Sequence, residues 1–161
     1  MTIQIVTTGG TIDKIYFDAK SEYQVGQPQV ADVLREANVT FPYEVISLLR
    51  KDSLEMTDED RLQIREAIAA SSHRQFVVTH GTDTMVQTAR ALVGLPGKTV
   101  VLTGAMQPAR FRTTDAVFNI GCAVTAVQLL PEGVYIVMNG RIFRPGHVKK
   151  NVTLNCFEET G

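Results

Sequence analysis

The sequence predicts an α/β domain: three layers, with an open, mainly parallel sheet of five strands and helices on both faces. Two observations indicate this class. Short apolar runs rich in β-branched residues alternate with segments of helical periodicity, which is typical of right-handed βαβ units. The runs are apolar at nearly every position, as in strands covered on both faces. The predicted strands are Ile3 to Thr7, Tyr43 to Leu49, Gln75 to Thr79, Thr99 to Thr103 and Val134 to Met138.

Four segments between the strands carry helix signals. A helix is predicted to begin at Thr57, which has an acid three residues later, and a long amphipathic helix is predicted over Thr113 to Leu129. Two further helices are predicted from about Val30 to Ala37 and from near Asp83. The residues predicted to face inward are Ile64, Ala67 and Ile68 on the helix after Thr57, and Val117, Ile120, Val124 and Val127 on the long helix.

The stretch from Asp13 to Gln27 departs from this alternation. It is long and polar, contains Tyr16 and Tyr23, and shows neither helical nor strand periodicity. A loop of this length in a compact domain is usually functional, although a merely mobile surface loop is the alternative.

Length and composition limit the functional classes. The chain of 161 residues favours a single domain, and 16 Lys and Arg against 17 Asp and Glu leave no basic cluster for nucleic acid. No run approaches the roughly 18 apolar residues of a membrane span, and the start lacks a signal-peptide pattern, so neither a membrane partner nor export is expected and the location expected is cytoplasmic. The two cysteines, Cys122 and Cys156, lack partners at metal-ligand spacing and are expected to be buried free thiols.

Small and hydroxylic residues follow four of the five predicted strands. Ligands of an open parallel sheet bind beyond the carboxyl ends of its strands, where glycines let the backbone approach a ligand and threonines supply hydroxyls. We therefore expect one polar crevice, with His80 more typical of a structural hydrogen-bonding residue than of a base. The residues at these ends are Thr7, Thr8, Gly9, Gly10 and Thr11; Asp52 and Ser53; His80, Gly81, Thr82, Asp83 and Thr84; and Thr103, Gly104, Ala105 and Met106.

The combination of these turns is more specific than any one of them. Thr8-Gly9-Gly10-Thr11-Ile12 and His80-Gly81-Thr82-Asp83-Thr84 resemble the two signature motifs of the bacterial-type L-asparaginases. Thr103-Gly104-Ala105-Met106-Gln107-Pro108, followed by Asp115 and Asn119, is also similar to that family. The resemblance extends over the whole chain but only over the family's N-terminal domain, so residues 1–161 are expected to form one such domain without the family's C-terminal one.

The resemblance implies a nucleophile in the first motif. Thr11 matches the threonine that attacks the side-chain amide carbon to give an acyl-enzyme. A free hydroxyl is a poor nucleophile and needs a group that takes or polarises its proton. In the family a loop tyrosine stands beside the threonine; Tyr23 fits the spacing best, and Tyr16 is the competitor.

The resemblance also implies a second triad. Thr82 and Asp83 match two of its members, and its lysine is Lys150, with Lys149 as the alternative if the alignment slips by one residue. Lys150, placed near Thr82 and shielded from water, would act as a base through the hydroxyl. Asp83, at a helix start, would stay ionised and bind a substrate ammonium.

The remaining expectations concern the substrate. Backbone N–H groups of the Gly10 and Thr82 turns would hold the oxyanion, and Ser53 matches the family's contact to the substrate α-carboxylate. The next residue, Leu54, is apolar where family members usually carry a polar one. The expected substrate-binding residues are Gly10, Ser53, Gly81, Thr82, Asp83 and Ala105.

These observations favour an amidohydrolase that cleaves the side-chain amide of L-asparagine, or a related small amide, with no metal and no cofactor. One alternative is an amide-binding module without efficient turnover. Another is an electron-transfer protein, because the fold class is flavodoxin-like or Rossmann-like and Thr7 to Thr11 resembles a flavodoxin phosphate loop; the chain, however, has no Trp and four Tyr for ring stacking. A homodimer or homotetramer is expected, since the family closes each crevice with a neighbouring subunit.

Overall fold

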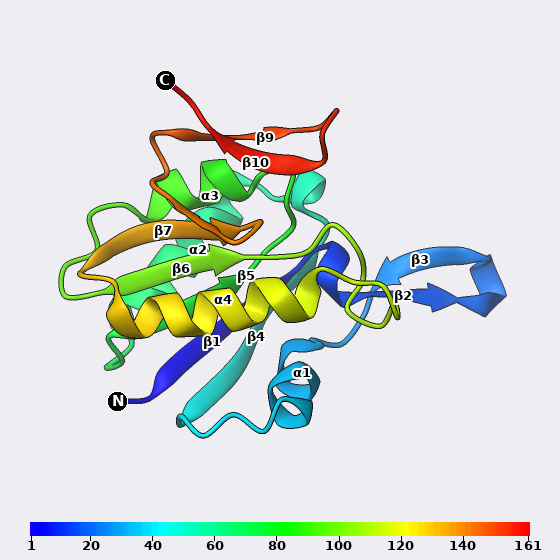
Figure 1. Ribbon diagram of the computed structural model, residues 1–161, viewed down its shortest axis with the longest axis horizontal. Coiled ribbons are helices and arrows are strands. Elements are labelled where there is room, and N and C mark those ends of the chain that lie inside the picture. The colour runs from blue at the N-terminus through cyan, green and yellow to red at the C-terminus, as the bar shows by residue number, and fades with distance from the viewer.

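A six-stranded sheet forms the centre of the molecule in the computed structural model, which describes all 161 residues (Figure 1). The strand order is β4-β1-β5-β6-β7-β8; neighbouring strands are parallel except β7 and β8, which are antiparallel. The strands are β1 Ile3–Gly9, β4 Tyr43–Lys51, β5 Gln75–Thr79, β6 Thr99–Thr103, β7 Gly133–Met138 and β8 Arg141–Phe143. The mainly parallel sheet and its five predicted strands are confirmed.

The prediction of five strands missed the edge strand β8. This strand is only three residues long and follows a tight turn in which Asn139 and Gly140 both have positive φ. A strand this short carries too few residues for a period-2 pattern to be visible in the sequence.

Four helices cover the two faces of the sheet and complete the predicted three layers. They are α1 Val30–Glu36, α2 Asp58–Ala70, α3 Met85–Leu92 and α4 Ala116–Leu129. One apolar core holds the inward residues of α2 and α3, and the other holds those of α1 and α4. Thr57 caps α2 with the predicted reciprocal arrangement. The Thr57 hydroxyl accepts from the Asp60 N–H, and the Asp60 carboxylate accepts from the Thr57 N–H.

Two details of the predicted helices were wrong. The long helix begins at Ala116 rather than Thr113, because the carboxylate of Asp115 is occupied by accepting the Met106 and Gln107 N–H groups. Val117, predicted to face inward, is 53% exposed. The other three residues predicted to face inward, Ile120, Val124 and Val127, are buried as predicted, and Ala116 and Ala123 complete the buried face of α4.

The stretch predicted as an irregular loop forms an antiparallel hairpin instead. Its strands are β2 Lys14–Phe17 and β3 Glu22–Val25, joined by the 3-10 turn Asp18–Lys20, and it projects away from the sheet (Figure 1). The 3-10 turn η1, Thr11–Asp13, connects it to β1. Both faces of the outer hairpin are exposed. Because neither face is buried, its sequence lacks the alternation of apolar and polar residues by which strands are recognised.

The rest of the chain forms a second hairpin over α3. It consists of β9 Val148–Asn151 and β10 Cys156–Glu159 (Figure 1). Cys122 and Cys156 are free thiols, as predicted, but each is half-buried rather than buried. None of the helices is both long enough and apolar enough to span a membrane.

Candidate active site

The turns that follow β1, β4, β5 and β6 are in direct contact. A Cβ on Gly10 would overlap the backbone of Gly81, and one on Gly81 would overlap the side chain of Ser53. A Cβ on Gly104 would overlap the carbonyl oxygen of His80. Gly10 also has φ +94°, which strongly favours glycine. Glycine at these positions therefore allows the turns to touch, and the four strand ends converge as expected.

Lys150 links the end of β5 to the β9–β10 hairpin. Its Nζ donates to Thr82 Oγ1 at 2.8 Å and to Asp83 Oδ1 at 2.7 Å. Thr82 is buried and the Lys150 side chain is only 16% exposed, so their contact lies largely out of water. The Asp83 side chain is 43% exposed, and its contact with Lys150 lies at the surface. The structure thus brings together the three residues that the sequence grouped.

The neighbouring lysine points elsewhere. Lys149 Nζ pairs with the Glu158 carboxylate at 3.2 Å, and its side chain is 60% exposed. Successive side chains of a strand face opposite sides, so only one of the two lysines of β9 can reach Thr82. The geometry selects Lys150 between the two alternatives.

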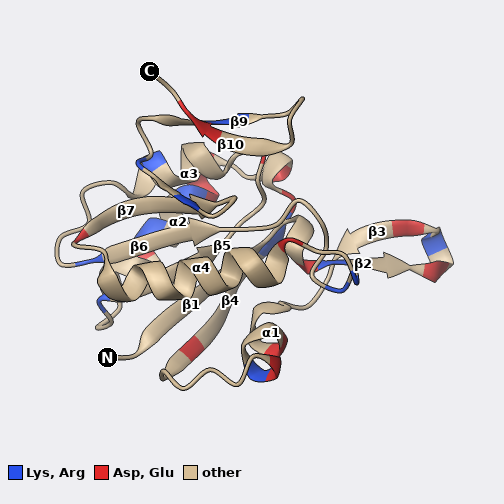
Figure 2. Ribbon diagram, viewed as in Figure 1, with Lys and Arg blue, Asp and Glu red and all other residues tan.

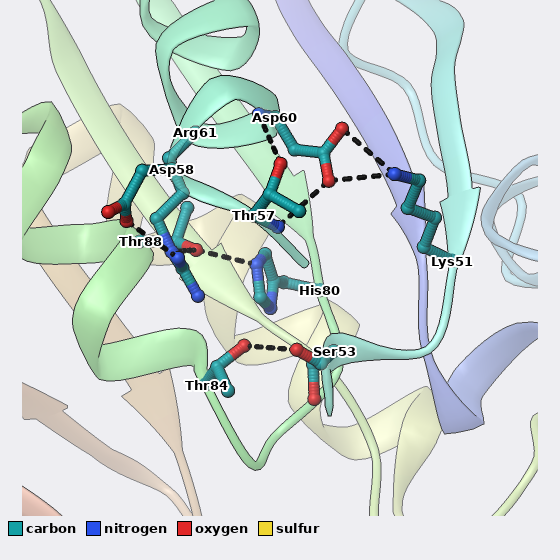
Figure 3. A network of polar contacts seen from close by, with 9 residues as sticks. All are labelled: Lys51, Ser53, Thr57, Asp58, Asp60, Arg61, His80, Thr84 and Thr88. Atoms are coloured by element: carbon teal, nitrogen blue, oxygen red, sulfur yellow. Dashed lines mark hydrogen bonds and ion pairs between the residues drawn. The ribbon is translucent and has the colours of Figure 1, made fainter. Parts of the chain in front are cut away.

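Two hydroxyls at this crevice make no hydrogen bond within the chain. Thr11 lies at the start of η1, directly after Gly10, and is partly buried. Ser53 is buried at the start of the 3-10 turn Ser53–Glu55, and its carbonyl accepts from the Thr84 hydroxyl at 2.7 Å (Figure 3). Neither hydroxyl is therefore committed to a partner within the chain. Ala105, also expected in the site, is buried at the end of β6.

His80 has a structural role, as the sequence indicated. Arg61 Nε donates to Thr88 Oγ1 at 3.1 Å, which leaves the Thr88 hydroxyl proton for His80 Nε2 at 2.8 Å (Figure 3). His80 Nδ1 must then carry the ring proton and donate it to Gly81 O at 2.7 Å. Burial lowers the pKa of His80 to about 4, so the ring is neutral near pH 7.

This network also orients the backbone of the second motif. The Gly81 carbonyl is held toward the His80 ring, and in a trans peptide the next N–H, that of Thr82, points the opposite way. The supporting residues Arg61 and Thr88 were missed by the sequence reasoning. They lie on α2 and α3, and no local pattern connects them to His80.

Two further polar clusters hold the loops around the crevice. Lys51 Nζ donates to both carboxylate oxygens of Asp60, at 3.1 and 2.8 Å, and so joins the end of β4, just before Ser53, to α2 (Figure 3). The hydrogen bond from Lys51, with that from the Thr57 N–H, lowers the pKa of Asp60. On the other side, Asn119 Nδ2 donates to Gly104 O at 2.9 Å and thereby fixes the turn after β6.

The two candidate tyrosines lie on one face of the projecting hairpin. Tyr16 and Tyr23 are direct cross-strand partners with ring centroids 5.5 Å apart, and Tyr23 also packs edge-on against Phe111 at 5.6 Å. Each tyrosine is 51% exposed, and neither hydroxyl hydrogen-bonds to Thr11. The structure therefore does not bring a tyrosine into hydrogen-bond contact with Thr11.

Asp13, at the base of this hairpin, was not singled out by the sequence reasoning. It is buried, and its Oδ1 accepts from the Gln29 N–H at 2.9 Å. Burial raises the pKa of Asp13 to about 6, against the opposing effects of the Gln29 hydrogen bond and the Arg50 charge. No group of three or more His, Cys, Asp or Glu side chains is arranged to hold a metal ion.

The raised pKa makes the stability of the chain depend on pH. The folded-state pKa of about 6 exceeds the value of 3.8 for a free carboxyl group, so the stability associated with protonation is complete below pH 3.8 and is lost as pH rises through 6. Asp13→Asn keeps the acceptor oxygen but not the charge. We expect the free energy of unfolding of the variant, relative to that of the wild type, to increase between pH 4 and pH 7. The gain reaches up to about 3 kcal/mol, at 1.36 kcal/mol per unit of pKa shift. Urea unfolding across this range measures it, and an advantage that is flat with pH would show that Asp13 does not titrate in this way.

The fold and the site define an α/β domain with a free threonine hydroxyl and a Thr-Lys-Asp cluster at one crevice. A family model described as "Asparaginase, N-terminal" matches residues 2–160. The chain belongs to the asparaginase family, and the resemblance of its motifs is confirmed.

Individual relatives agree with this assignment. The chain is 35% identical over 164 residues to a "Probable L-asparaginase periplasmic" of Haemophilus influenzae, covering 94% of the chain and 46% of the relative. It is 34% identical over 169 residues to "L-asparaginase 2" of Escherichia coli, covering 94% and 47%. The structure of the thermostable L-asparaginase from Thermococcus kodakarensis superposes with a TM-score of 0.85 at 29% identity, covering 99% of this chain and 51% of that one. The chain thus spans about half the length of these relatives.

Proposed function

We propose that this domain is an amidohydrolase that cleaves the side-chain amide of L-asparagine, or of a related small amide, to the acid and ammonia. One observation carries the proposal: Lys150 is hydrogen-bonded to both Thr82 and Asp83, in the turn that contacts the turn of Thr11. Thr11 and Thr82 each follow a glycine, and these two glycines, Gly10 and Gly81, are in backbone contact. Membership of the asparaginase family supports the same activity and speaks against the flavodoxin alternative.

The proposed reaction has two steps. The Thr11 oxygen attacks the amide carbon, its proton passes to the leaving nitrogen by way of the neighbouring proton carriers, and ammonia departs from the acyl-enzyme. Water then attacks the ester, and the hydroxyl of Thr11 is restored. Thr82 and Lys150 are the proposed proton carriers, since a hydrogen bond of 2.8 Å joins Lys150 Nζ to Thr82 Oγ1. The N–H groups of the Gly10 and Thr82 turns stabilise the oxyanion, a contribution on the order of 10² to 10³ in rate per donor.

The proposed substrate contacts lie at the same rim. Ser53 offers a free hydroxyl to the α-carboxylate, and Asp83 Oδ2 remains unpaired for the α-ammonium while Oδ1 is bound by Lys150. Leu54 is 74% exposed and offers no polar group. Recognition of the ammonium therefore depends on Asp83, and we expect modest affinity for free amino acids.

Ammonia release from a panel of amides tests the proposal. Asparagine, glutamine and simple aliphatic amides are compared at equal concentration, with binding of each followed separately by calorimetry. We expect hydrolysis of asparagine, or of one small amide, above the rate of the Thr11→Ala chain. Binding of an amide without ammonia release from any member of the panel would instead support the binding module.

The hairpin tyrosines are proposed to act when the hairpin closes over the substrate. Closure would exclude water and bring one phenol to Thr11. We favour Tyr23, so Tyr23→Phe is expected to reduce kcat more than Tyr16→Phe does. Both variants keep the stacked ring pair, and each is therefore a matched control for the other. A larger loss in Tyr16→Phe would reverse the assignment.

We also propose that residues 1–161 act as one domain in a cytoplasmic homodimer or homotetramer. The Ser53 and Thr82 side chains are already buried within a single chain, so a partner is needed only to close the mouth of the crevice. Light scattering at micromolar concentration tests the assembly, and a clean monomer with full activity would contradict it.

One relative carries "periplasmic" in its name, so cell fractionation tests the location.

A further inference from the structure

Asp13 holds three segments together at the base of the hairpin. Its N–H donates to Gly10 O at 3.1 Å within the turn that carries Thr11, and its carbonyl accepts from the Gly26 N–H at 2.8 Å, where β3 leaves the hairpin. Its carboxylate accepts from the Gln29 N–H at 2.9 Å, at the start of α1. Both ends of the hairpin thus meet at one residue, two positions after Thr11.

Only one of these links depends on the side chain. The contacts to Gly10 and Gly26 run through the backbone, as does the bond from the Ala109 N–H to Ile12 O at 3.0 Å. The carboxylate of Asp13 supplies the acceptor for the Gln29 N–H, and the Gln29 side chain is held separately, with its Oε1 accepting from Arg110 at 3.0 Å. A substitution that removes this acceptor therefore breaks the hydrogen bond from the hairpin base to the start of α1 and leaves the backbone contacts intact.

The charged groups around Asp13 do not neutralise it directly. Arg50, on β4, acts on the carboxylate through its charge but forms no ion pair with it. Lys14 pairs with Asp52 at 3.0 Å, and Arg110 is bound to the Gln29 side chain. Asp13 is thus a buried carboxylate without a salt bridge, which costs folding free energy at neutral pH. A buried acid without a salt bridge at the base of a projecting hairpin is better explained by positioning than by stability.

We infer that Asp13 is a positioning residue of the proposed amidase site: its carboxylate keeps the hairpin base and the Thr11 turn in a fixed relation to α1. The inference rests on the proposed function. It assigns Asp13 no contact with substrate. When the hairpin closes, this link determines where the hairpin's aromatic face arrives relative to the Thr11 hydroxyl. Small errors in such placement reduce the rate strongly, since a shift of about 1 Å can cost on the order of 100-fold.

Three variants test the inference. Asp13→Ala removes the acceptor, Asp13→Asn keeps an acceptor oxygen without the charge, and Asp32→Asn makes the same acid-to-amide change at a half-exposed site on α1. We expect Asp13→Ala to lower kcat about 10- to 100-fold with little change in KM, while its melting temperature at pH 7 is unchanged or raised. Asp13→Asn should restore most of kcat, and Asp32→Asn should match the wild type.

Amide hydrogen exchange supplies a readout that needs no substrate. We expect the Gln29 amide to exchange faster in Asp13→Ala and at the wild-type rate in Asp13→Asn, while the Gly26 amide, which is bonded to the Asp13 backbone, keeps its rate in both variants. Unchanged exchange at Gln29 in Asp13→Ala, or an unchanged kcat, would overturn the inference. If the wild-type chain hydrolyses no amide, the proposed function fails, and the exchange experiment still decides whether Asp13 links the hairpin to α1.

Discussion

Thr11→Ala is expected to lower amide hydrolysis by several orders of magnitude while the chain remains folded. The hydroxyl of Thr11 is the group proposed to form the covalent bond, and an alanine cannot replace it. In the folded chain this hydroxyl makes no hydrogen bond, so its removal should change the free energy of unfolding by less than about 1 kcal/mol. Steady-state ammonia release and a urea melt of the same preparation measure both quantities.

Two further variants sharpen this experiment. Thr11→Ser keeps a hydroxyl and should retain part of the activity, whereas Thr40→Ala makes the same change at an exposed position and should leave it intact. Trapping an acyl intermediate on the wild type, but not on Thr11→Ala, would identify the oxygen. A Thr11→Ala chain that hydrolyses asparagine at the wild-type rate would refute the mechanism.

Thr82 and Lys150 are expected to act as a unit. The Lys150 amine and the Thr82 hydroxyl share a hydrogen bond of 2.8 Å, so loss of either breaks the same proton path. Thr82→Val and Lys150→Met should each reduce kcat by two or more orders of magnitude, and the double variant should be little worse than either single one. Losses that multiply in the double variant would show that the two residues do not share a path.

Lys149→Met is the matched control for this cycle. Lys149 has the same side chain on the same strand, but it pairs with Glu158 on the surface. Its substitution should leave kcat within about twofold, because an exposed ion pair contributes little. A larger effect from Lys149 than from Lys150 would mean that the wrong lysine has been assigned.

Much of the fold could be predicted because its signals are local. The strands β1, β5 and β6 are buried at nearly every position and have mainly apolar centres, and α2 carries its cap at Thr57 and an inward stripe through Ile64 and Ile68. The edge strand β8 and the β2–β3 hairpin were not predicted, because they lack such local signals. Their residues are largely exposed, so burial imposed no pattern on them.

The location of the candidate site followed from a general property of parallel sheets. The carboxyl ends of β1, β4, β5 and β6 meet at one edge, so the turns after them had to lie near each other. That reasoning placed Thr11, Ser53 and Thr82 in one crevice without any knowledge of their side-chain contacts. Residue type and strand order were sufficient for it.

The contacts within the site depended on tertiary structure. Lys150 meets Thr82 across 68 positions of sequence, and its selection over Lys149 depends on which face of β9 is turned toward α3. Asp13 meets Gln29 only because the hairpin returns the chain to its own base, and the tautomer of the buried His80 ring is fixed by side chains of α2 and α3. Local sequence patterns indicate whether a residue is buried and in which element it lies. They do not indicate its hydrogen-bond partners, because hydrogen bonds between distant segments form only when packing brings those segments together.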